Sequence, residues 1–421
     1  MAKRTKAAPS TDPLPPQADG GGVFDVLVVG GGMVGGAFAL ACSGKGLSIG
    51  LVEARPPQRD WPKGEVDLRV SALSRASQRM LARLGAWERI AALGASPYRR
   101  MHVWDGVSGA AITFDSADLG EPDLGHIVEN RVIQLALWER LEQAQDLALM
   151  VPASISDLER GPAMSRVILG DGRRVEARLL VAADGRDSLI RELAGIPTRG
   201  WDYDQQAIVA NVRPELWHAE TAWQRFLPTG PLALLPLADG RCSIVWSATQ
   251  GRAQELLDLD DQGFSDALTE ASEGRLGRIQ SQGPRAALPL RLQHAERYVE
   301  PGLALIGDAA HAIHPLAGQG VNLGFLDAAA LAAALDLALE RGRDLAATWT
   351  LRRYERARRG DNLAMLMAMD AFKRAFGSRL PPLVAARSLG FAVSDRLGPL
   401  KRRFMERALG SGEDLPPLAR P

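Results

Sequence analysis

The sequence predicts an α/β fold in which a Rossmann-like domain carries an inserted antiparallel sheet and is followed by a C-terminal helical region. Three observations predict it. Two apolar runs, at 24–29 and 47–52, flank a glycine-rich turn and an Ala-rich segment. Short β-rich runs occupy the middle of the chain, and residues beyond 346 place apolar side chains at helical spacing. A chain of 421 residues is long enough for two domains of about 100–200 residues each.

The N-terminal apolar run leads into a phosphate-binding pattern. Phe24–Val29 is continuously apolar, as expected of a parallel strand buried on both faces. Gly30, Gly32 and Gly35 follow in G-x-G-x-x-G spacing, and the second apolar run ends at Glu53. The glycines allow a tight turn, a close approach of the backbone to a pyrophosphate, and close helix–strand packing, while Glu53 can accept from ribose hydroxyls. The pattern predicts a dinucleotide site for FAD or NAD rather than NADP; a glycine-rich turn that binds nothing is the alternative.

Two later segments repeat the strand-then-turn pattern. In residues 179–196 an apolar run ends at Asp184-Gly185, and Ser188 and Arg191 open a helix. A third apolar run ends at Gly307-Asp308 and is followed by an Ala-rich helix at about 323–339.

Taken in this order, the three motifs resemble the aromatic-hydroxylase group of single-component flavoprotein monooxygenases, from Val23 to about Tyr354. Within that group, segments 67–90, 124–141 and 314–331 resemble the ubiquinone-biosynthesis hydroxylases, which hydroxylate polyprenylated phenol or benzoquinol rings. The resemblance implies non-covalent FAD, O2, and NAD(P)H or a redox protein as electron donor. The expected activity is ring hydroxylation through a flavin C4a-hydroperoxide.

The resemblance also assigns roles after the third motif. Asp308 would hold the ribityl chain of FAD. The residues that follow form the flavin-edge loop, without an obligate acid or base: Pro315, Gly318, Gly320, Val321 and Asn322. The proline would lie beside the reactive edge, the two glycines would let the backbone approach the ring, and the last two residues would present main-chain amides to its pyrimidine end. These amides and the helix N-terminus would stabilise negative charge on reduced flavin.

Two arginines match the family's cofactor-binding pattern. Arg69 would reach the FAD diphosphate; a surface ion pair with Asp67 is the alternative. Arg131 would also contact the cofactor, although a solvated ion pair with Glu129 explains it as well.

Asp184 and Arg191 allow two interpretations. The resemblance associates this motif with contacts to FAD and the nicotinamide. A turn-and-cap motif that organises the fold explains the same residues.

The histidines do not predict a metal site. His311 and His314 have a possible ligand spacing, but the chain's six histidines are scattered and no cysteine pair or HExxH supplies further ligands. We expect no metal. His311 is expected to be a fixed hydrogen-bonding group, and His314 to face either the substrate or solvent.

The inserted sheet is predicted from β-rich runs at 99–115, 206–212 and 231–247. In the last run, Asp239-Gly240 separates two apolar segments, which is a strong hairpin signal. We expect this sheet to cover the flavin, with the substrate between them. The predicted division begins with a disordered leader, residues 1–22. The FAD-binding domain is discontinuous and comprises 23–95, 129–200 and 285–345. The substrate domain comprises 96–128 and 201–284, and the C-terminal helical region is 346–421.

Charge and composition restrict the partners and the location. The formal net charge is zero, with 50 basic and 50 acidic residues, so nothing calls for nucleic acid. Cys42 and Cys242 lie far apart, which favours a reducing compartment without a disulfide. The leader lacks the apolar core of a secretory signal, and no uninterrupted apolar stretch reaches about 18 residues.

The C-terminal region departs from this balance. Residues 341–410 hold sixteen Lys and Arg against six Asp and Glu, a net charge of +10. Apolar side chains recur there at helical spacing, with basic neighbours: Met365, Met369, Phe372 and Phe376, beside Lys373, Arg374 and Arg379. Core packing is the favoured explanation, and docking on a membrane or a partner is the second. The expected location is cytoplasmic, with peripheral contact to the inner face of the membrane.

Other functions remain open at this point. The chain could hydroxylate a different aromatic substrate, or serve as a catalytically idle FAD-binding scaffold within a quinone-biosynthesis complex. Other proteins of that pathway and a second copy of the chain are the partners considered.

Overall fold

A computed structural model describes most of the chain. The described residues are 23–312, 320–377, 380, 382, 384–385, 387–388, 390, 401–402, 405–406, 409–410 and 414–421. The expected leader and the candidates His314, Pro315 and Gly318 therefore lie outside the described residues.

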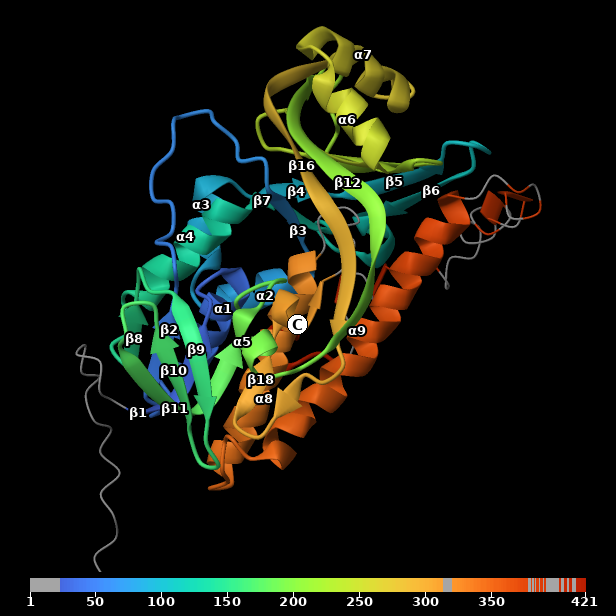
Figure 1. Ribbon diagram of the computed structural model, residues 1–421. Coiled ribbons are helices and arrows are strands. Elements are labelled where there is room, and N and C mark those ends of the chain that lie inside the picture. The colour runs from blue at the N-terminus through green and yellow to red at the C-terminus, as the bar shows by residue number, and fades with distance from the viewer. Residues whose placement is uncertain are drawn as a thin grey trace, which may run out of the picture.

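One half of the molecule is built on a largely parallel sheet, as predicted, and strands from both the N-terminal part of the chain and residues 299–305 contribute to it (Figure 1). Its order is β17-β18-β11-β1-β2-β8, and the antiparallel arm β10-β9 extends from β11. Apolar residues fill β1 and β2 because both faces of these strands are buried. The strands of this sheet are β1 Val23–Val29, β2 Ile49–Val52, β8 Leu147–Met150, β9 Ile155–Arg160, β10 Ser165–Leu169, β11 Arg174–Ala182, β17 Val299–Glu300 and β18 Leu303–Leu305.

Helices complete this half, and its apolar core is the largest in the described chain. Helix α1 packs against α4 and α8, and a small sheet of order β3-β7-β4 adjoins them. The elements are α1 Met33–Cys42, α2 Arg75–Arg83, α3 Trp87–Gly94, α4 Asn130–Leu141, α5 Leu189–Leu193, α8 Gly320–Glu340, η2 Gly307–Ala309, β3 Val70–Leu73, β4 Ser96–Tyr98 and β7 Gly125–Glu129.

The second large sheet has the order β19-β16-β12-β15-β14-β13-β5-β6. Helices α6 and α7 cover one face of it, where a second apolar core forms (Figure 1). Its elements are β5 Arg100–Asp105, β6 Ala111–Asp115, β12 Thr198–Pro214, β13 Thr221–Leu227, β14 Gly230–Pro236, β15 Cys242–Thr249, β16 Ile279–Ala295, β19 His311–Ala312, η1 Ser116–Leu119, α6 Gln250–Asp258 and α7 Asp261–Ala271.

The expected hairpin is present in this sheet. Strands β14 and β15 pair antiparallel up to Pro236 and Cys242, and Gly240 takes a positive φ of 86° in the turn between them. The amide of Leu237 donates to the carbonyl of Arg241 across the turn, at 2.9 Å.

Two features depart from a purely antiparallel insertion. Strand β5 pairs with β13 in parallel, with Thr221 opposite Arg100. The two strands lie far apart in the sequence, so no tight turn imposes an antiparallel pairing. Strand β4, at the start of the segment expected to join this sheet, pairs with β7 in the small sheet instead.

Strands β12 and β16 connect the two halves of the molecule. Each is 17 residues long, and they pair antiparallel along most of their length. At its far end, β16 pairs with β19, where His294 lies opposite His311. The long ribbon thus runs from the helix-covered end of the sheet to the Gly307–Ala309 turn (Figure 1).

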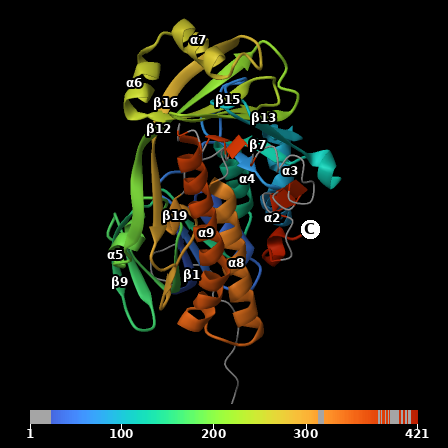
Figure 2. The same ribbon diagram turned by 90° about the vertical axis from the view of Figure 1, so that its right-hand side faces the viewer.

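The C-terminal region begins with α9, Thr348–Gly377, which runs along the flank of the molecule beside α8 (Figure 2). Phe376 is buried and stacks on Phe226 with the ring centroids 4.2 Å apart. Met365 and Met369 are half-buried. Phe376 therefore confirms core packing at one position of the apolar stripe; the side chains of Phe372 and Lys373, and Arg379, lie outside the described residues. A final turn, η4 Pro417–Ala419, packs against α2 and α8.

The structure bears on two expectations drawn from composition, one about the two cysteines and one about long apolar segments. Cys42 and Cys242 are both free and buried. Helix α8, however, is long and apolar enough to cross a membrane by length and composition, with a mean hydropathy of 1.5 in its most apolar window. A criterion of about 18 uninterrupted apolar residues does not detect this helix, because Asp327 and Asp336 interrupt its apolar sequence. Most of that window is buried inside the protein, as in a core helix.

Candidate functional site

The glycine-rich turn after β1 has the geometry of a phosphate cradle. Gly30 has a φ of 102°, and a Cβ there would lie 2.4 Å from the carbonyl oxygen of Ala183. A Cβ on Gly35 would lie 1.9 Å from the carbonyl oxygen of Gly30. Nothing lies within 4 Å of the Cβ position of Gly32, which is the N-cap of α1 and has no side-chain cap. The space and the uncapped helix N-terminus fit a pyrophosphate.

Glu53 lies beside this turn, at the end of β2. Its Oε2 accepts from the amide of Gly31 at 2.6 Å, and its Oε1 accepts from the amide of Arg55 at 3.0 Å. A carboxylate has about four acceptor positions, so capacity remains for ribose hydroxyls. Trp138 fixes the same turn from α4, since its Nε1 donates to the carbonyl of Gly31 at 2.8 Å. Sequence reasoning missed Trp138 because its partner lies far away in the chain.

Asp308 presents an exposed carboxylate in the η2 turn. No described residue donates a hydrogen bond to its side chain. Crowding by protein atoms reduces the hydration of the carboxyl and raises its pKa. The positive charges of His311, Arg186 and Arg69 lower the pKa but do not outweigh this effect. An exposed acceptor without a protein partner, beside these charges, fits a carboxylate that receives a hydroxyl from a bound cofactor.

Arg69 belongs to the same surroundings. Its side chain is exposed, and its charge lowers the pKa of Asp308. Within the described part of the chain it forms no ion pair with Asp67, the alternative raised by the sequence. Its carbonyl accepts from the amide of Asn130 at 2.9 Å, which fixes the backbone at the start of β3.

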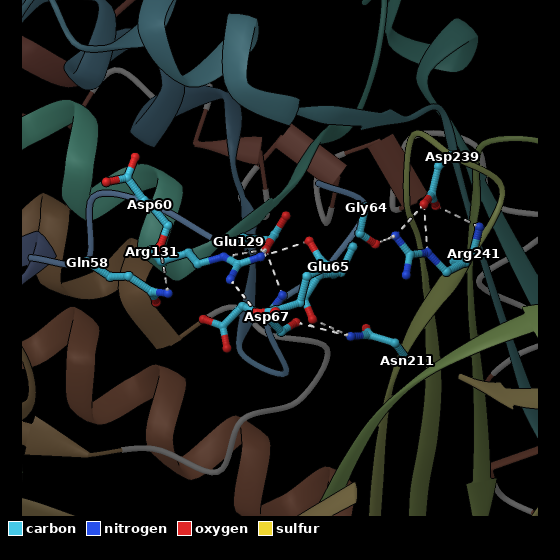
Figure 3. Close-up of polar contacts among 11 residues, drawn as sticks. Gln58, Asp60, Gly64, Glu65, Asp67, Glu129, Arg131, Asn211, Asp239 and Arg241 are labelled. Carbon is cyan, nitrogen blue, oxygen red and sulfur yellow. Dashed lines mark hydrogen bonds and ion pairs between the residues drawn. The ribbon is translucent and has the colours of Figure 1, made fainter. Parts of the chain in front are cut away.

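Arg131 is buried and engaged by the loop that precedes β3 (Figure 3). Its Nε donates to Glu129 at 2.8 Å, and its two terminal nitrogens donate to the carboxylate and the carbonyl of Glu65, each at 2.9 Å. The guanidinium also lies 4.4 Å from the ring centroid of Trp61. The pairing with Glu129 that the sequence offered as an alternative is therefore present, but it is buried and shared with Glu65.

The same loop also contacts the second sheet (Figure 3). The amide of Asp67 donates to Glu129 at 2.7 Å. From β12, Asn211 donates through Nδ2 to the carbonyl of Val66 at 2.9 Å. From the β14–β15 turn, Arg241 donates to the carbonyl of Gly64 at 2.8 Å. The loop that carries Arg69 is thus held from both halves of the protein.

Asp184 and Arg191 organise the turn after β11. Asp184 accepts from the hydroxyl of Ser188 at 2.5 Å and from the amide of Ile190 at 3.2 Å, and burial raises its pKa. Ser188 in turn caps α5 by accepting from the amide of Arg191 at 3.0 Å. The side chain of Arg191 is buried and donates to the carbonyl of Ala309 at 2.9 Å. The structure contains the turn and the helix cap that the second interpretation predicted. Arg191 also connects the Asp184-Gly185 turn to the Gly307-Asp308 turn.

Behind Asp308 lies a buried carboxylate that sequence reasoning missed. Asp327, on α8, is fully buried. Its Oδ2 pairs with Nε2 of His311 at 2.5 Å and accepts from the amide of Gly307 at 3.2 Å. Its Oδ1 accepts from Nε of Arg358 at 2.9 Å and from Nδ2 of Asn362 at 3.0 Å. Burial opposes ionisation, but the charges of His311 and Arg358 outweigh it and hold the pKa of Asp327 below its usual value.

This network, defined here as the Asp327 cluster, continues toward β16. Nδ2 of Asn362 lies 3.3 Å from the hydroxyl of Tyr298, which pairs with Nε2 of His294 at 3.1 Å. Burial, followed by the charge of His311, lowers the pKa of His294 to about 4. The expectation that His311 is a fixed hydrogen-bonding group is confirmed. The only signal in the sequence was a single acid within the apolar run around Asp327.

Gly320, Val321 and Asn322 form the first turn of α8. Amides in a first helical turn have no intrahelical partner, which fits their expected role toward a ligand. The side chain of Asn322 has a second function: its Oδ1 accepts from the amide of Ser74 at 3.0 Å and the hydroxyl of Ser77 at 2.7 Å. Its Nδ2 donates to the carbonyl of Ala72 at 2.8 Å. One side chain thereby fixes the start of α8 to β3 and α2.

Among the described residues, no group of three or more His, Cys, Asp or Glu side chains could hold a metal ion. His311 is engaged by Asp327, and His314 lies outside the described range.

Comparisons with known proteins agree with this geometry. Residues 23–367 match the family described as FAD binding domain. The chain is 40% identical over 386 residues to the 3-demethoxyubiquinol 3-hydroxylase of Escherichia coli K12, covering 92% of this chain and 98% of that protein. It is 40% identical over 414 residues to the ubiquinone hydroxylase UbiL of Rhodospirillum rubrum, covering 98% and 95%. The crystal structure of p-nitrophenol 4-monooxygenase PnpA from Pseudomonas putida DLL-E4 shares the fold, with a TM-score of 0.74 and 19% identity over 92% of this chain and 98% of that one.

Proposed function

This chain belongs to the FAD-binding-domain family and, within that family, to the hydroxylases of ubiquinone biosynthesis, and we propose that it is an FAD-dependent monooxygenase acting on the ring of a polyprenylated phenol or benzoquinol. The observation that carries the proposal is the match over nearly the full length of two hydroxylases. Three features of the fold support it: the open position at Gly32, the acceptor at Glu53 and the exposed carboxylate of Asp308.

We assign the residues to parts of the cofactor as follows. The Gly30–Gly35 turn and the α1 N-terminus hold the pyrophosphate, and Glu53 accepts from the adenosine ribose. Asp308 accepts from the ribityl chain, and Arg69 approaches the diphosphate. The amides of Val321 and Asn322 serve the pyrimidine end of the ring. When bound and reduced, FAD supplies the activation of O2 that places a hydroxyl group on an electron-rich ring.

Arg131, Asp184 and Arg191 receive positioning roles in this proposal. The guanidinium of Arg131 is engaged by Glu65 and Glu129, so it holds the loop that carries Arg69. Asp184 and Arg191 hold the two turns together. Pro315, Gly318 and Gly320 keep the flavin-edge role that the family resemblance gives them.

The substrate is proposed to bind between the second sheet and the flavin-edge loop. A phenol or quinol ring is already activated toward electrophilic oxygen, so no general base is required. The protein orients the ring and excludes water. The proposed electron donor is NAD(P)H or a redox protein, and the proposed location is the cytoplasm with access to membrane-borne substrate.

The test uses FAD-loaded protein and a short-chain quinol or phenol that dissolves in water. A hydroxylase oxidises NADH or NADPH and consumes O2 faster when the ring compound is added, and hydroxylated product appears. Because the chemistry belongs to the flavin, the stimulation should survive dialysis against a chelator. Retained FAD without any stimulation, by nicotinamide or by a chemically reduced redox protein, would instead identify a catalytically idle scaffold.

A further inference from the structure

Helix α9 has an outward face that differs from the apolar stripe seen in the sequence. Along its 30 residues, exposed side chains recur at intervals of three and four. Residues at this spacing share one face of a helix. They form the outward face of α9: Trp349, Arg353, Arg356, Gly360, Leu363, Met367, Ala371 and Arg374, with Arg352 and Arg359 at its margins.

The first half of this face carries an excess of positive charge. Within the described residues, the ion pairs of α9 are made by Arg358 and Arg374. None involves the four exposed arginines of the first half: Arg352, Arg353, Arg356 and Arg359. The formal charge of the whole chain is zero, so this is a local excess of positive charge and not a general property.

The second half of the face is apolar and open. Met367 is 65% exposed and Leu363 is 43% exposed, one helical turn apart. Trp201, from β12, is 46% exposed and lies beside this half, with the guanidinium of Arg374 5.8 Å from its ring centroid. Trp349 is 51% exposed at the other end of the helix.

We infer that the outward face of α9 docks on an anionic lipid bilayer. Arginines on one side of a helix, together with Leu, Met and Trp on the same side, match the chemistry of a lipid interface, where headgroups are anionic and the acyl boundary is apolar. A helix of this length presents about 45 Å of continuous surface at 1.5 Å per residue, and it runs along the flank of the molecule (Figure 2).

The outward face of α9 differs from the apolar stripe that the sequence offered as a second candidate for docking on a membrane or a partner. Met365, Met369 and Phe376 turn inward on the opposite side of α9, where Phe376 stacks on Phe226. Docking on the outward face therefore leaves the protein core undisturbed, and it does not depend on the proposed reaction.

The experiment measures flotation of full-length, FAD-loaded protein with two kinds of vesicle, phosphatidylcholine alone and phosphatidylcholine with phosphatidylglycerol. Each arginine near an anionic surface raises partitioning about fivefold. Reversing Arg353 and Arg356 together (Arg353→Glu with Arg356→Glu) should lower binding to the anionic vesicles at least tenfold. High salt should lower it as well, because exposed charges are screened.

A matched control applies the same charge change elsewhere. Arg174 and Arg278 are also exposed, and Arg174→Glu with Arg278→Glu should leave binding within about twofold of the wild type if the effect requires this face. For the apolar half, Met367→Ser should weaken binding severalfold, whereas Met164→Ser, at a side chain that is 40% exposed, should not. Flavin absorbance and thermal unfolding verify that each variant is folded.

Three results would overturn the inference. The wild type could fail to float with anionic vesicles at low salt, the control pair could reduce flotation as much as the α9 pair, or the α9 pair could change the oligomeric state without affecting flotation. The last result would assign the face to a second copy of the chain. None of these three results bears on the proposed function, which is tested separately by the stimulation of reductant oxidation with a water-soluble ring substrate.

Discussion

At the scale of single residues, Asp308 is the clearest test of the site. Its carboxylate is exposed, lacks a described hydrogen-bond donor, and lies near the charges of Arg69 and Arg186. A charge-assisted hydrogen bond contributes about 1.5–3 kcal/mol. Asp308→Ala should therefore weaken FAD binding at least tenfold, measured by fluorescence titration of the apoprotein, whereas His314→Ala should retain the flavin. Equal affinity for both variants, or the reverse order, would contradict the assignment.

How far the sequence predicts the site depends on where the partner of each residue lies. Gly30, Gly35 and Glu53 could be predicted because a strand, a turn and a helix are consecutive in the chain. Asp327 and Trp138 could not, because their partners lie 16 to 107 positions away and only the folded chain brings them together. Asn322 was predicted through its amide, but its side chain holds β3 and α2.

At the scale of elements, the Asp327 cluster joins α8, α9 and the turn that carries Asp308. Removing the charge leaves Arg358 and His311 with a weaker acceptor in a buried site, and breaking a buried pair costs about 3–5 kcal/mol. Asp327→Asn should therefore lower the free energy of unfolding by urea and also weaken FAD binding, because the amide of Gly307 loses a charged partner.

Asp336→Asn is the matched comparison. Asp336 lies on the same helix and pairs with Lys45, but it is 40% exposed. Exposed pairs contribute about 0–1 kcal/mol, so this variant should unfold and bind FAD almost as the wild type does. If the two variants behave alike, the Asp327 cluster does not position the turn.

Elements with a local signal were predictable, and those that depend on remote pairing were not. The Asp239-Gly240 hairpin follows from its turn residues. The parallel pairing of β5 with β13 follows from neither strand's sequence, because the connection between them is long and leaves the direction free. The outward face of α9 was also missed, since three of its eight members are arginines, which a pattern of apolar residues does not include.

At the scale of the whole molecule, the cofactor itself can be measured. The glycine turn and Glu53 are suited to an adenosine ribose and a pyrophosphate, which FMN lacks. The purified protein should therefore be yellow and release FAD rather than FMN on denaturation, identified by chromatography of the supernatant. A colourless protein that FAD cannot reconstitute, or one that releases FMN, would contradict the proposed function.

The ribbon of β12 and β16 has a mechanical consequence. Backbone hydrogen bonds join its two 17-residue strands except at two register shifts, between Asp202 and Gln205 and between Ala210 and Val212, and His294 near one end pairs with His311 of β19. Because the two strands are paired along most of their length, we expect a displacement of the sheet by an incoming ring to displace the turn that holds Asp308 as well. Substrate binding and cofactor binding would then be coupled through this ribbon, and the pairing of His294 with His311 is the place where the ribbon meets the turn.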